Sequence, residues 1–393
     1  MGTPREATDT ITGYYYQFDY FILKILECKH DDDIVVIEGV EDIDLDTADE
    51  KTAIQCKYYA KTDYNHSVIA KPLRFMLDHY LSNEKSGMRY KIYGHYKNGA
   101  EKLKIPVTLT FFKENFLNLL VLKDICITDD QICRFLDILE IDNCARSLED
   151  QENEIMKNIK KIFTCNDFES NHYYYNNALR VVRKLSTDQY LKNRRISKRK
   201  FIQEIDNKDI LFNIWYLRKK DVREYGRFIK REFFSNLNNS PFERFFLIEC
   251  DSVVSESEIK SLLIKISTQF HNISSRNLRP FCPYVYLHGI SPEKLNAVLL
   301  GLQNDNFMFI DGYDFKGASF SVKSITKEAN FHNGIKLKII HEMSQIDLIL
   351  KEIHATREIY QFFTTKILDL SVDNIHKHEK IPIEQTVHID HII

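Results

Sequence analysis

Hydrophobic and polar positions along the first hundred residues follow two different periods. An apolar stretch of helical period runs from Gly13 to about Cys28, and the β-branched run Ile34–Ile37 that follows is typical of a buried strand. A polar turn then separates two further strand-like runs, which predicts a hairpin. The expected elements after the first strand are hairpin strands at 41–47 and 52–59, a helix at 67–81 and a strand at 89–94.

The pattern changes twice further along the chain. Helical segments are expected from 117 to 162, with polar breaks near Thr128 and Asp142, and a basic helical stretch follows. A last region mixes strands and helices, with strands near 283–288, 307–311 and 335–340, helices near 256–270 and 292–302, and a long helix over 345–368. We therefore predict an α/β chain in three parts, namely an α/β domain at 1–165, a basic helical connector at 166–240 and a second, smaller α/β domain at 241–393.

Composition sets limits on the class of protein. The chain has 393 residues, long enough for more than one core, and its 44% hydrophobic content is ordinary for a globular protein. A net charge of −3 argues against coating nucleic acid by bulk attraction, but it permits a local basic groove. Cations crowd between Arg180 and Lys200, which predicts equally a phosphate contact, an exposed helical face or a surface for an acidic partner.

Cysteines and termini suggest the compartment. None of the eight cysteines forms a C-x-x-C pair, so the pattern favours reduced core thiols over a zinc site. The N-terminal residues lack the apolar core of a signal peptide, and no apolar run reaches the roughly 18 residues that a membrane helix needs. We expect a cytoplasmic protein with no membrane partner.

One group of polar residues in the hairpin suggests chemistry. Gln55 and Lys57 are two positions apart on a strand, so their side chains share a face, and Asp42 and Asp44 share a face on the partner strand. Phosphodiester cleavage needs carboxylates that hold a divalent cation and a nearby lysine that orients the attacking water. The hairpin therefore predicts a Mg²⁺ (or Mn²⁺) site.

A second carboxylate is needed, and Glu38 and Asp44 both remain possible. Glu38 lies four residues before Asp42, about 13 Å away in a straight strand, which is too far for one metal ion. Gly39 lies between them and permits a bend that would bring the two carboxylates together. We expect Glu38 to be the second carboxylate.

Three segments in this order carry a family resemblance, namely Gly13–Gln17, Ile37–Ile43 and Ile54–Tyr58. Together they resemble the N-terminal double-stranded-DNA nuclease domain of bacterial anti-phage effectors, a branch of the PD-(D/E)xK superfamily that is joined to SAVED sensor domains in CBASS defence and also occurs in Lamassu systems. The resemblance implies a restriction-endonuclease-like mixed-sheet domain. It matches Asp42 to the hallmark acid, Lys57 to the hallmark lysine, Glu38 to the preceding acid, and Gln55 to the position of the second acid and metal ligand.

The resemblance covers residues 10–100 and implies partners for the rest. The C-terminal two-thirds does not resemble a SAVED domain; it is closer to the nuclease subunits of Lamassu and ABC-three-component systems, which implies an SMC-like ATPase subunit, a small third subunit and a homo-oligomer when active. The 241–393 domain is then expected to dock these partners. Contacts to double-stranded DNA are expected from Gln17, Lys61, Lys71, Arg194 and Arg195.

Other interpretations stay open at this point. Asp42, Gln55 and Lys57 could form an ordinary solvated hairpin face. A second possibility is a non-catalytic scaffold that binds DNA or a partner, although such a scaffold has no need of both Asp42 and Lys57. A third is a stand-alone restriction enzyme for modified DNA, against which stands the lack of an evident base-reading module.

Overall fold

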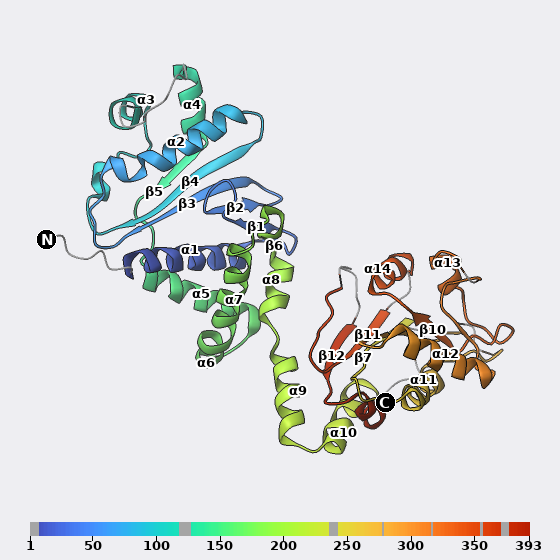
Figure 1. Ribbon diagram of the computed structural model, residues 1–393. Coiled ribbons are helices and arrows are strands. Elements are labelled where there is room, and N and C mark those ends of the chain that lie inside the picture. The colour runs from blue at the N-terminus through green and yellow to red at the C-terminus, as the bar shows by residue number, and fades with distance from the viewer. Residues whose placement is uncertain are drawn as a thin grey trace. The chain divides into compact units, whose positions relative to one another are not determined.

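The computed structural model describes residues 8–117, 127–235, 243–276, 279–315, 317–353, 357–370 and 377–393. The chain forms two compact units, Met1–Asn207 and Lys208–Ile393 (Figure 1). Their boundary lies inside the segment 166–240, where the sequence predicts a separate connector. Apolar positions explain the difference, because Val181 and Phe201 are buried in the core of the N-terminal unit, whereas Leu217 and Ile229 are buried in that of the C-terminal unit.

The N-terminal unit is a six-stranded mixed sheet with helices on both faces. Its main elements are α1 (Thr8–Glu27), β1 (Ile34–Ile37), β2 (Ile43–Asp46), β3 (Lys51–Tyr59), α2 (His66–Ser82), β4 (Met88–Tyr96), α3 (Leu109–Phe112), α4 (Asp129–Asp137), β5 (Leu139–Asp142), α5 (Leu148–Phe163), α6 (Asp167–Glu169), α7 (Tyr175–Ser186), β6 (Arg195–Ser197) and α8 (Lys198–Ile205). The strand order is β5-β4-β3-β2-β1-β6.

Strand pairing follows the predicted hairpin at the centre of this sheet. β2 pairs antiparallel with β1 and with β3, while β3, β4 and β5 run parallel. The β2–β3 hairpin that the sequence predicts is therefore confirmed. β5 and β6 are short strands within stretches that the sequence predicts as helical; each pairs at an edge of the sheet, where few residues are needed to complete the ladder.

Alternation along β3 divides the side chains between two cores. Ile54 and Cys56 join a core with α1, α5 and α7, whereas Ala53 joins the core under α2 (Figure 1). A two-residue side-chain period produces this division. The sheet is therefore covered on both faces. A polar side chain on it can reach solvent only where the helices leave the sheet uncovered.

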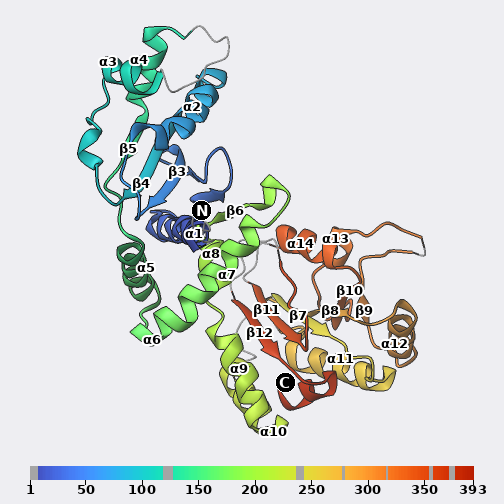
Figure 2. The ribbon, with the colours of Figure 1, turned by 60° about the vertical axis from the view of Figure 1, so that its left-hand side comes forward.

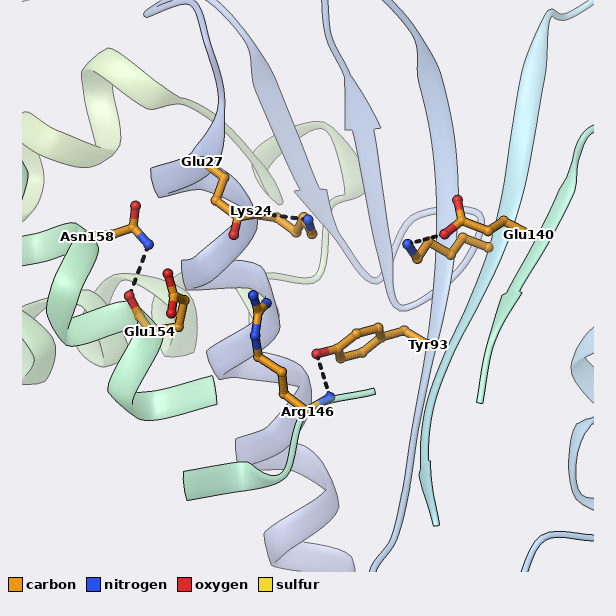
Figure 3. Close-up of polar contacts among 8 residues, drawn as sticks. Lys24, Glu27, Tyr93, Glu140, Arg146, Glu154 and Asn158 are labelled. Carbon is orange, nitrogen blue, oxygen red and sulfur yellow. Dashed lines mark hydrogen bonds and ion pairs between the residues drawn. The ribbon is translucent and has the colours of Figure 1, made fainter. Parts of the chain in front are cut away.

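Helix α1 is tied to the sheet by tyrosines. Tyr93 on β4 stacks on Tyr20 of α1 with ring centroids 3.8 Å apart, and its hydroxyl oxygen accepts the Arg146 backbone N–H at 3.3 Å (Figure 3). The hydroxyl of Tyr16 donates to the Arg146 carbonyl at 2.9 Å. These contacts fix the rotation of α1, and with it the direction in which Gln17 points.

The C-terminal unit is an all-parallel, six-stranded sheet. Its main elements are α9 (Lys208–Lys219), α10 (Val222–Phe233), β7 (Glu243–Glu249), α11 (Glu256–Phe270), β8 (Tyr284–His288), α12 (Pro292–Asn304), β9 (Phe309–Ile310), α13 (Val322–Ile325), β10 (Leu337–Ile340), α14 (Met343–Glu352), β11 (Arg357–Phe363) and β12 (Lys377–Pro382) (Figure 2). The strand order is β12-β11-β7-β8-β10-β9. The second α/β domain is thus present.

One sequence prediction in this unit is wrong. The long helix expected over 345–368 ends at Glu352, and β11 pairs with β7 in the middle of the sheet. The run Ile359–Phe363 is buried on both faces, so it lacks the alternation that identifies a half-exposed strand. Of the helices that the structure describes, none is long and apolar enough to cross a membrane.

Candidate active site at the β1–β2 turn

The turn between β1 and β2 brings two acids close enough that the charge of Asp42 raises the pKa of Glu38. Ile37 and Ile43 form the last pair of the two strands, and the intervening turn is closed by the Glu38 N–H, which donates to the Asp42 carbonyl at 2.8 Å. Glu38 has a positive φ of 53°, a conformation that costs a non-glycine residue free energy and that collects at functional sites. The chain bends over residues 38–42 as expected, with the positive φ at Glu38 and not at Gly39, so Glu38 and Asp42 are not separated by a straight strand.

Asp44 stabilises this turn rather than lining it. Its carboxylate accepts the backbone N–H of Val40 at 2.6 Å and that of Glu41 at 3.2 Å. Gly39 packs so close to this carboxylate that a Cβ there would collide with it. Both oxygens of Asp44 are therefore engaged within the turn, which leaves Glu38 as the better candidate for a second carboxylate.

Asp42 lies where the edge of β3 becomes free. β2 begins at Ile43, which pairs with Ile54 of β3. The residues of β3 after Ile54 therefore have no β2 partner. The Cys56 N–H there donates to Asp42 Oδ2 at 2.8 Å. The Gln17 side-chain amide donates to the same oxygen at 2.9 Å, and the Gln55 amide also donates to it. Three donors from α1 and β3 thus converge on one carboxylate oxygen.

The two glutamines complete the polar shell of Asp42. Each amide carries an oxygen as well as its NH₂ group, and rotation about the last side-chain bond exchanges them. Gln17 and Gln55 can therefore donate to the free carboxylate or present oxygens to a cation beside it. Gln17 thus contacts Asp42 directly, and its predicted contact with DNA stays a prediction.

Lys57 supplies the positive charge of the site. It lies two residues beyond Gln55 on β3, and its ammonium group lowers the pKa values of Asp42, Glu38 and Glu41. Burial acts more strongly in the opposite direction and raises the pKa of all three carboxyls. Lys57 therefore lies near several partly desolvated acids whose carboxyl groups hold protons more tightly than they do in water.

Glu41 belongs to this charge cluster and was not selected from the sequence. Burial, Asp42 and Asp44 together raise its pKa to about 8, whereas Lys57 lowers it. Strand alternation would place Glu41 on the face opposite Asp42, but Glu41 lies in the turn, where alternation does not apply. Only a turn assigned to residues 38–42 could have indicated this position from sequence.

The predicted DNA contacts divide into two groups. Arg194 lies at the site, because its guanidinium donates to the Glu38 carbonyl at 3.4 Å and its charge lowers the pKa of Glu38. Arg195 instead lies 4.0 Å from Asp46, and Lys61 pairs with Asp9 at 2.8 Å.

Lys71 is the last predicted DNA contact, and it lies on the exposed side of α2. Its ammonium group is 5.7 Å from the Phe75 ring. The contacts of Lys61, Lys71 and Arg195 with Asp9, Phe75 and Asp46 do not test a DNA surface, so their contact with DNA stays a prediction.

The donor set fits a hard divalent cation. Mg²⁺ is commonly held by one or two carboxylates together with neutral oxygens, waters and substrate phosphate. Glu38, Asp42 and the Gln55 amide offer that set; burial raises the pKa of both carboxyls, and the charge of Asp42 adds to the rise at Glu38, so a cation would stabilise their ionised forms. Among the described residues no group of three or more His, Cys, Asp or Glu forms a metal cluster, so the site has two carboxylates plus amides.

Comparisons with known proteins return solved structures only. No family model and no curated protein matches the chain. The structures found include the Acinetobacter baumannii Cap4 SAVED/CARF-domain containing receptor with the cyclic trinucleotide 2'3'3'-cAAA, at 10% identity and a TM-score of 0.29 over 92% of this chain and 91% of the receptor. The same receptor with 3'3'3'-cAAA matches at 9% identity and a TM-score of 0.29, over 89% and 90% of the two chains.

Both structures are of a receptor that contains a SAVED/CARF domain, with a cyclic trinucleotide. They carry the SAVED domain that the C-terminal sequence does not resemble. A TM-score of 0.29 is too low to carry an argument about this chain, so the proposal below rests on the Asp42 site.

Proposed function

We propose that the chain is a metal-dependent endonuclease that cuts double-stranded DNA as the effector of a bacterial anti-phage defence system. The observation that carries this proposal is the convergence of Gln17, Gln55 and the Cys56 N–H on Asp42, with Lys57 two residues further along β3. On an ordinary solvated hairpin face, water would hydrogen-bond the carboxylate, and three protein donors on one oxygen would not be expected. Retention of the lysine beside the acids favours an enzyme over a binding scaffold.

Each side chain then has a role in hydrolysis. Asp42, Glu38 and Gln55 would hold the cation, and Gln17 would orient Asp42. Lys57 would orient the attacking water and stabilise charge that develops on the scissile phosphate. Arg194, which already contacts the turn, is positioned to bind an adjacent phosphate. When bound, Mg²⁺ or Mn²⁺ supplies a water of lowered pKa and neutralises phosphate charge.

The test is plasmid cleavage by the purified full chain. We expect supercoiled DNA to be nicked and linearised with Mg²⁺ or Mn²⁺ and to stay intact with EDTA. The matched control is the Asp42→Asn protein, which keeps the size of the side chain and an acceptor for the Cys56 N–H but removes the charge. Cleavage that persists in EDTA, or in the control, contradicts the proposal.

Control of such an activity is also part of the proposal. A non-specific nuclease must rest in an inactive state, and we propose that residues 241–393 dock an SMC-like ATPase subunit and a small third subunit that hold it inactive. Release would then allow homo-oligomers to form. Co-purification of the three proteins, followed by cleavage assays on the complex and on the free chain, tests this: an equally active complex would contradict it.

A second candidate function concerns the C-terminal unit. α12 follows β8 on one face of the parallel sheet, and α14 follows β10 on the other face, so the carboxyl ends of these adjacent strands form a switch point of the kind that binds ligands in open α/β sheets. His341 lies 3.2 Å from Asp311 at this edge. A sensor of a small ligand is therefore the alternative function of this unit.

The ligands named for the receptor structures provide the probes for this alternative. Calorimetric titration of the full chain with 2'3'3'-cAAA and 3'3'3'-cAAA, repeated on a His341→Ala protein, measures binding at the switch point. Saturable heat that the substitution removes would support a sensor. Absence of heat with either trinucleotide counts against recognition of these ligands.

A further inference from the structure

Helices α9 and α10, called here the α9–α10 hairpin (residues 208–233), expose aromatic side chains. Phe212 and Trp215 of α9 are 50% and 59% exposed. Phe212 lies 6.0 Å from Phe228 of α10, measured between ring centroids, and Tyr216 stacks on the same ring at 5.0 Å. Tyr216 and Phe228 also pack partly against the core of the C-terminal unit, so Phe212 and Trp215 are the aromatic side chains of the hairpin that stay exposed.

Cations line the exposed side of α10 at helical spacing. The four positions are i, i+4, i+7 and i+8, which places them on one face, away from the buried Tyr225 and Ile229. They form the α10 cation stripe: Arg223, Arg227, Lys230 and Arg231. Arg218 and Lys219 add two more exposed cations one turn after Trp215.

Nearby acids are largely used within the hairpin. The Asp221 carboxylate caps α10, where it accepts the backbone N–H groups of Arg223 at 2.8 Å and Glu224 at 2.9 Å. Glu224 pairs with Lys220 at 2.9 Å, which is not part of the stripe. Arg223 and Arg227 also lower the pKa of the Asp221 carboxyl by their charge, and Glu232 lies 3.5 Å from Arg231. The four cations of the stripe therefore outnumber the two acids beside them.

This density of charge favours nucleic acid over a protein partner. The whole chain carries a net charge of −3, so a basic surface here is not a general property of the molecule. A protein partner would have to present an acidic surface of matching density, whereas a nucleic-acid backbone carries such charge whatever its sequence. The stripe extends over about 12 Å of helix, a length in which a DNA duplex carries on the order of seven phosphate charges.

We propose that the α9–α10 hairpin is a docking surface for duplex DNA, with the α10 cation stripe on the phosphates and Trp215 at the edge of the contact. The proposal takes its choice of double-stranded DNA from the proposed function. It adds a binding surface outside the Asp42 site, in the C-terminal unit, where the sequence indicated only a trend in basic residues. It requires no motion and no further ligand.

Trp215 provides a direct readout, because it is the chain's one tryptophan. The full-length Lys57→Ala protein in EDTA is titrated with a short duplex, so that cleavage plays no part. We expect saturable quenching of tryptophan emission, with the same midpoint as the anisotropy of labelled DNA. Binding by anisotropy without any change in Trp215 emission would overturn the proposal.

A matched pair of charge reversals then separates the stripe from bulk charge. Arg223→Glu/Arg227→Glu is compared with Lys323→Glu/Lys351→Glu, which has the same change in net charge but alters exposed lysines of α13 and α14, whose buried residues pack on the other face of the sheet. We expect at least a tenfold loss of affinity for the first protein only. The slope of log affinity against log salt should also fall by about two in that protein.

Equal losses in both double variants, or none in either, would overturn the proposal and leave the surface to an acidic protein partner. Failure of this inference is distinguishable from failure of the proposed function. A chain that cuts DNA without a Trp215 response contradicts the docking surface alone. A chain whose Trp215 responds to DNA, but which does not cut it under any metal condition, contradicts the nuclease alone.

Discussion

Asp42 and Asp44 are two residues apart and do different work. Asp42 receives donors from α1 and β3 and faces Lys57, whereas Asp44 accepts two backbone N–H groups of its own turn. Sequence alternation could place both acids on one hairpin face but could not separate their roles. The difference in their roles depends on where the turn begins, and the pattern of polar and apolar residues does not determine that position.

Substitutions at these two acids should therefore have opposite signatures. Asp44→Ala removes the acceptor of two part-buried N–H groups of the turn and should lower the free energy of unfolding by about 1–3 kcal/mol. Asp42→Asn should leave stability unchanged or higher while abolishing cleavage. Urea unfolding and plasmid cleavage on both proteins measure this; a reversed pattern would exchange the two assignments.

Asp19 gives a prediction at a residue outside the site. It is 2% exposed on α1, accepts the Tyr175 hydroxyl at 2.7 Å, and has a pKa that burial raises to about 7. The folded state therefore holds this proton more tightly than the unfolded state, so its contribution to stability is lost as pH rises from about 4 to about 7.

Asp19→Asn removes that titration. The variant should gain stability relative to the wild type across this pH range, reaching a few kcal/mol at most, from about 1.4 kcal/mol per pKa unit. Urea unfolding at pH 5 and pH 8 measures the difference. An advantage that is the same at both pH values would show that Asp19 is ionised throughout.

Among elements, the hairpin was predictable and the central strand β11 was not. β-branched alternation on either side of a polar turn indicated β2 and β3, and through them the positions of Gln55 and Lys57. β11 is buried on both faces between β7 and β12, so no alternation marks it, and its apolar run continues the period of α14. Burial by partners distant in sequence decides such a segment.

The turn between β1 and β2 can be tested with two glycines. Gly39→Ala places a Cβ against the Asp44 carboxylate and should destabilise the fold by about 1–3 kcal/mol. Gly13→Ala is the matched control, because Gly13 lies within α1 with no atom near the new Cβ, and it should stabilise by up to about 1 kcal/mol. Equal effects of the two substitutions in urea unfolding would contradict the packing of the turn.

For the whole molecule, the two units suggest a division between chemistry and control. The proposed active site lies in Met1–Asn207, and the proposed partner surface and the α9–α10 hairpin lie in Lys208–Ile393. The sequence indicated that a catalytic domain comes first, but the boundary within 166–240 depends on which core each helix joins. Packing between residues distant in sequence determines which core each helix joins, and composition does not reveal that packing.

Self-association is the prediction at this scale. One active site cuts one strand, so a double-strand break calls for two sites, and we expect linear plasmid to appear only at concentrations where light scattering detects oligomers. The nicking rate per chain should stay the same across the range. A chain that is monomeric at all concentrations and still linearises plasmid at full rate would contradict this part of the account.

The central claim is that Lys57 acts with Asp42 in phosphodiester cleavage. Its most direct test is the initial rate of plasmid cleavage with Mg²⁺ for Lys57→Ala against Lys51→Ala, which removes an exposed lysine from the same strand, six residues earlier. The account predicts a loss of about a hundredfold or more for Lys57→Ala and a near wild-type rate for Lys51→Ala. Equal rates for the two proteins would contradict it.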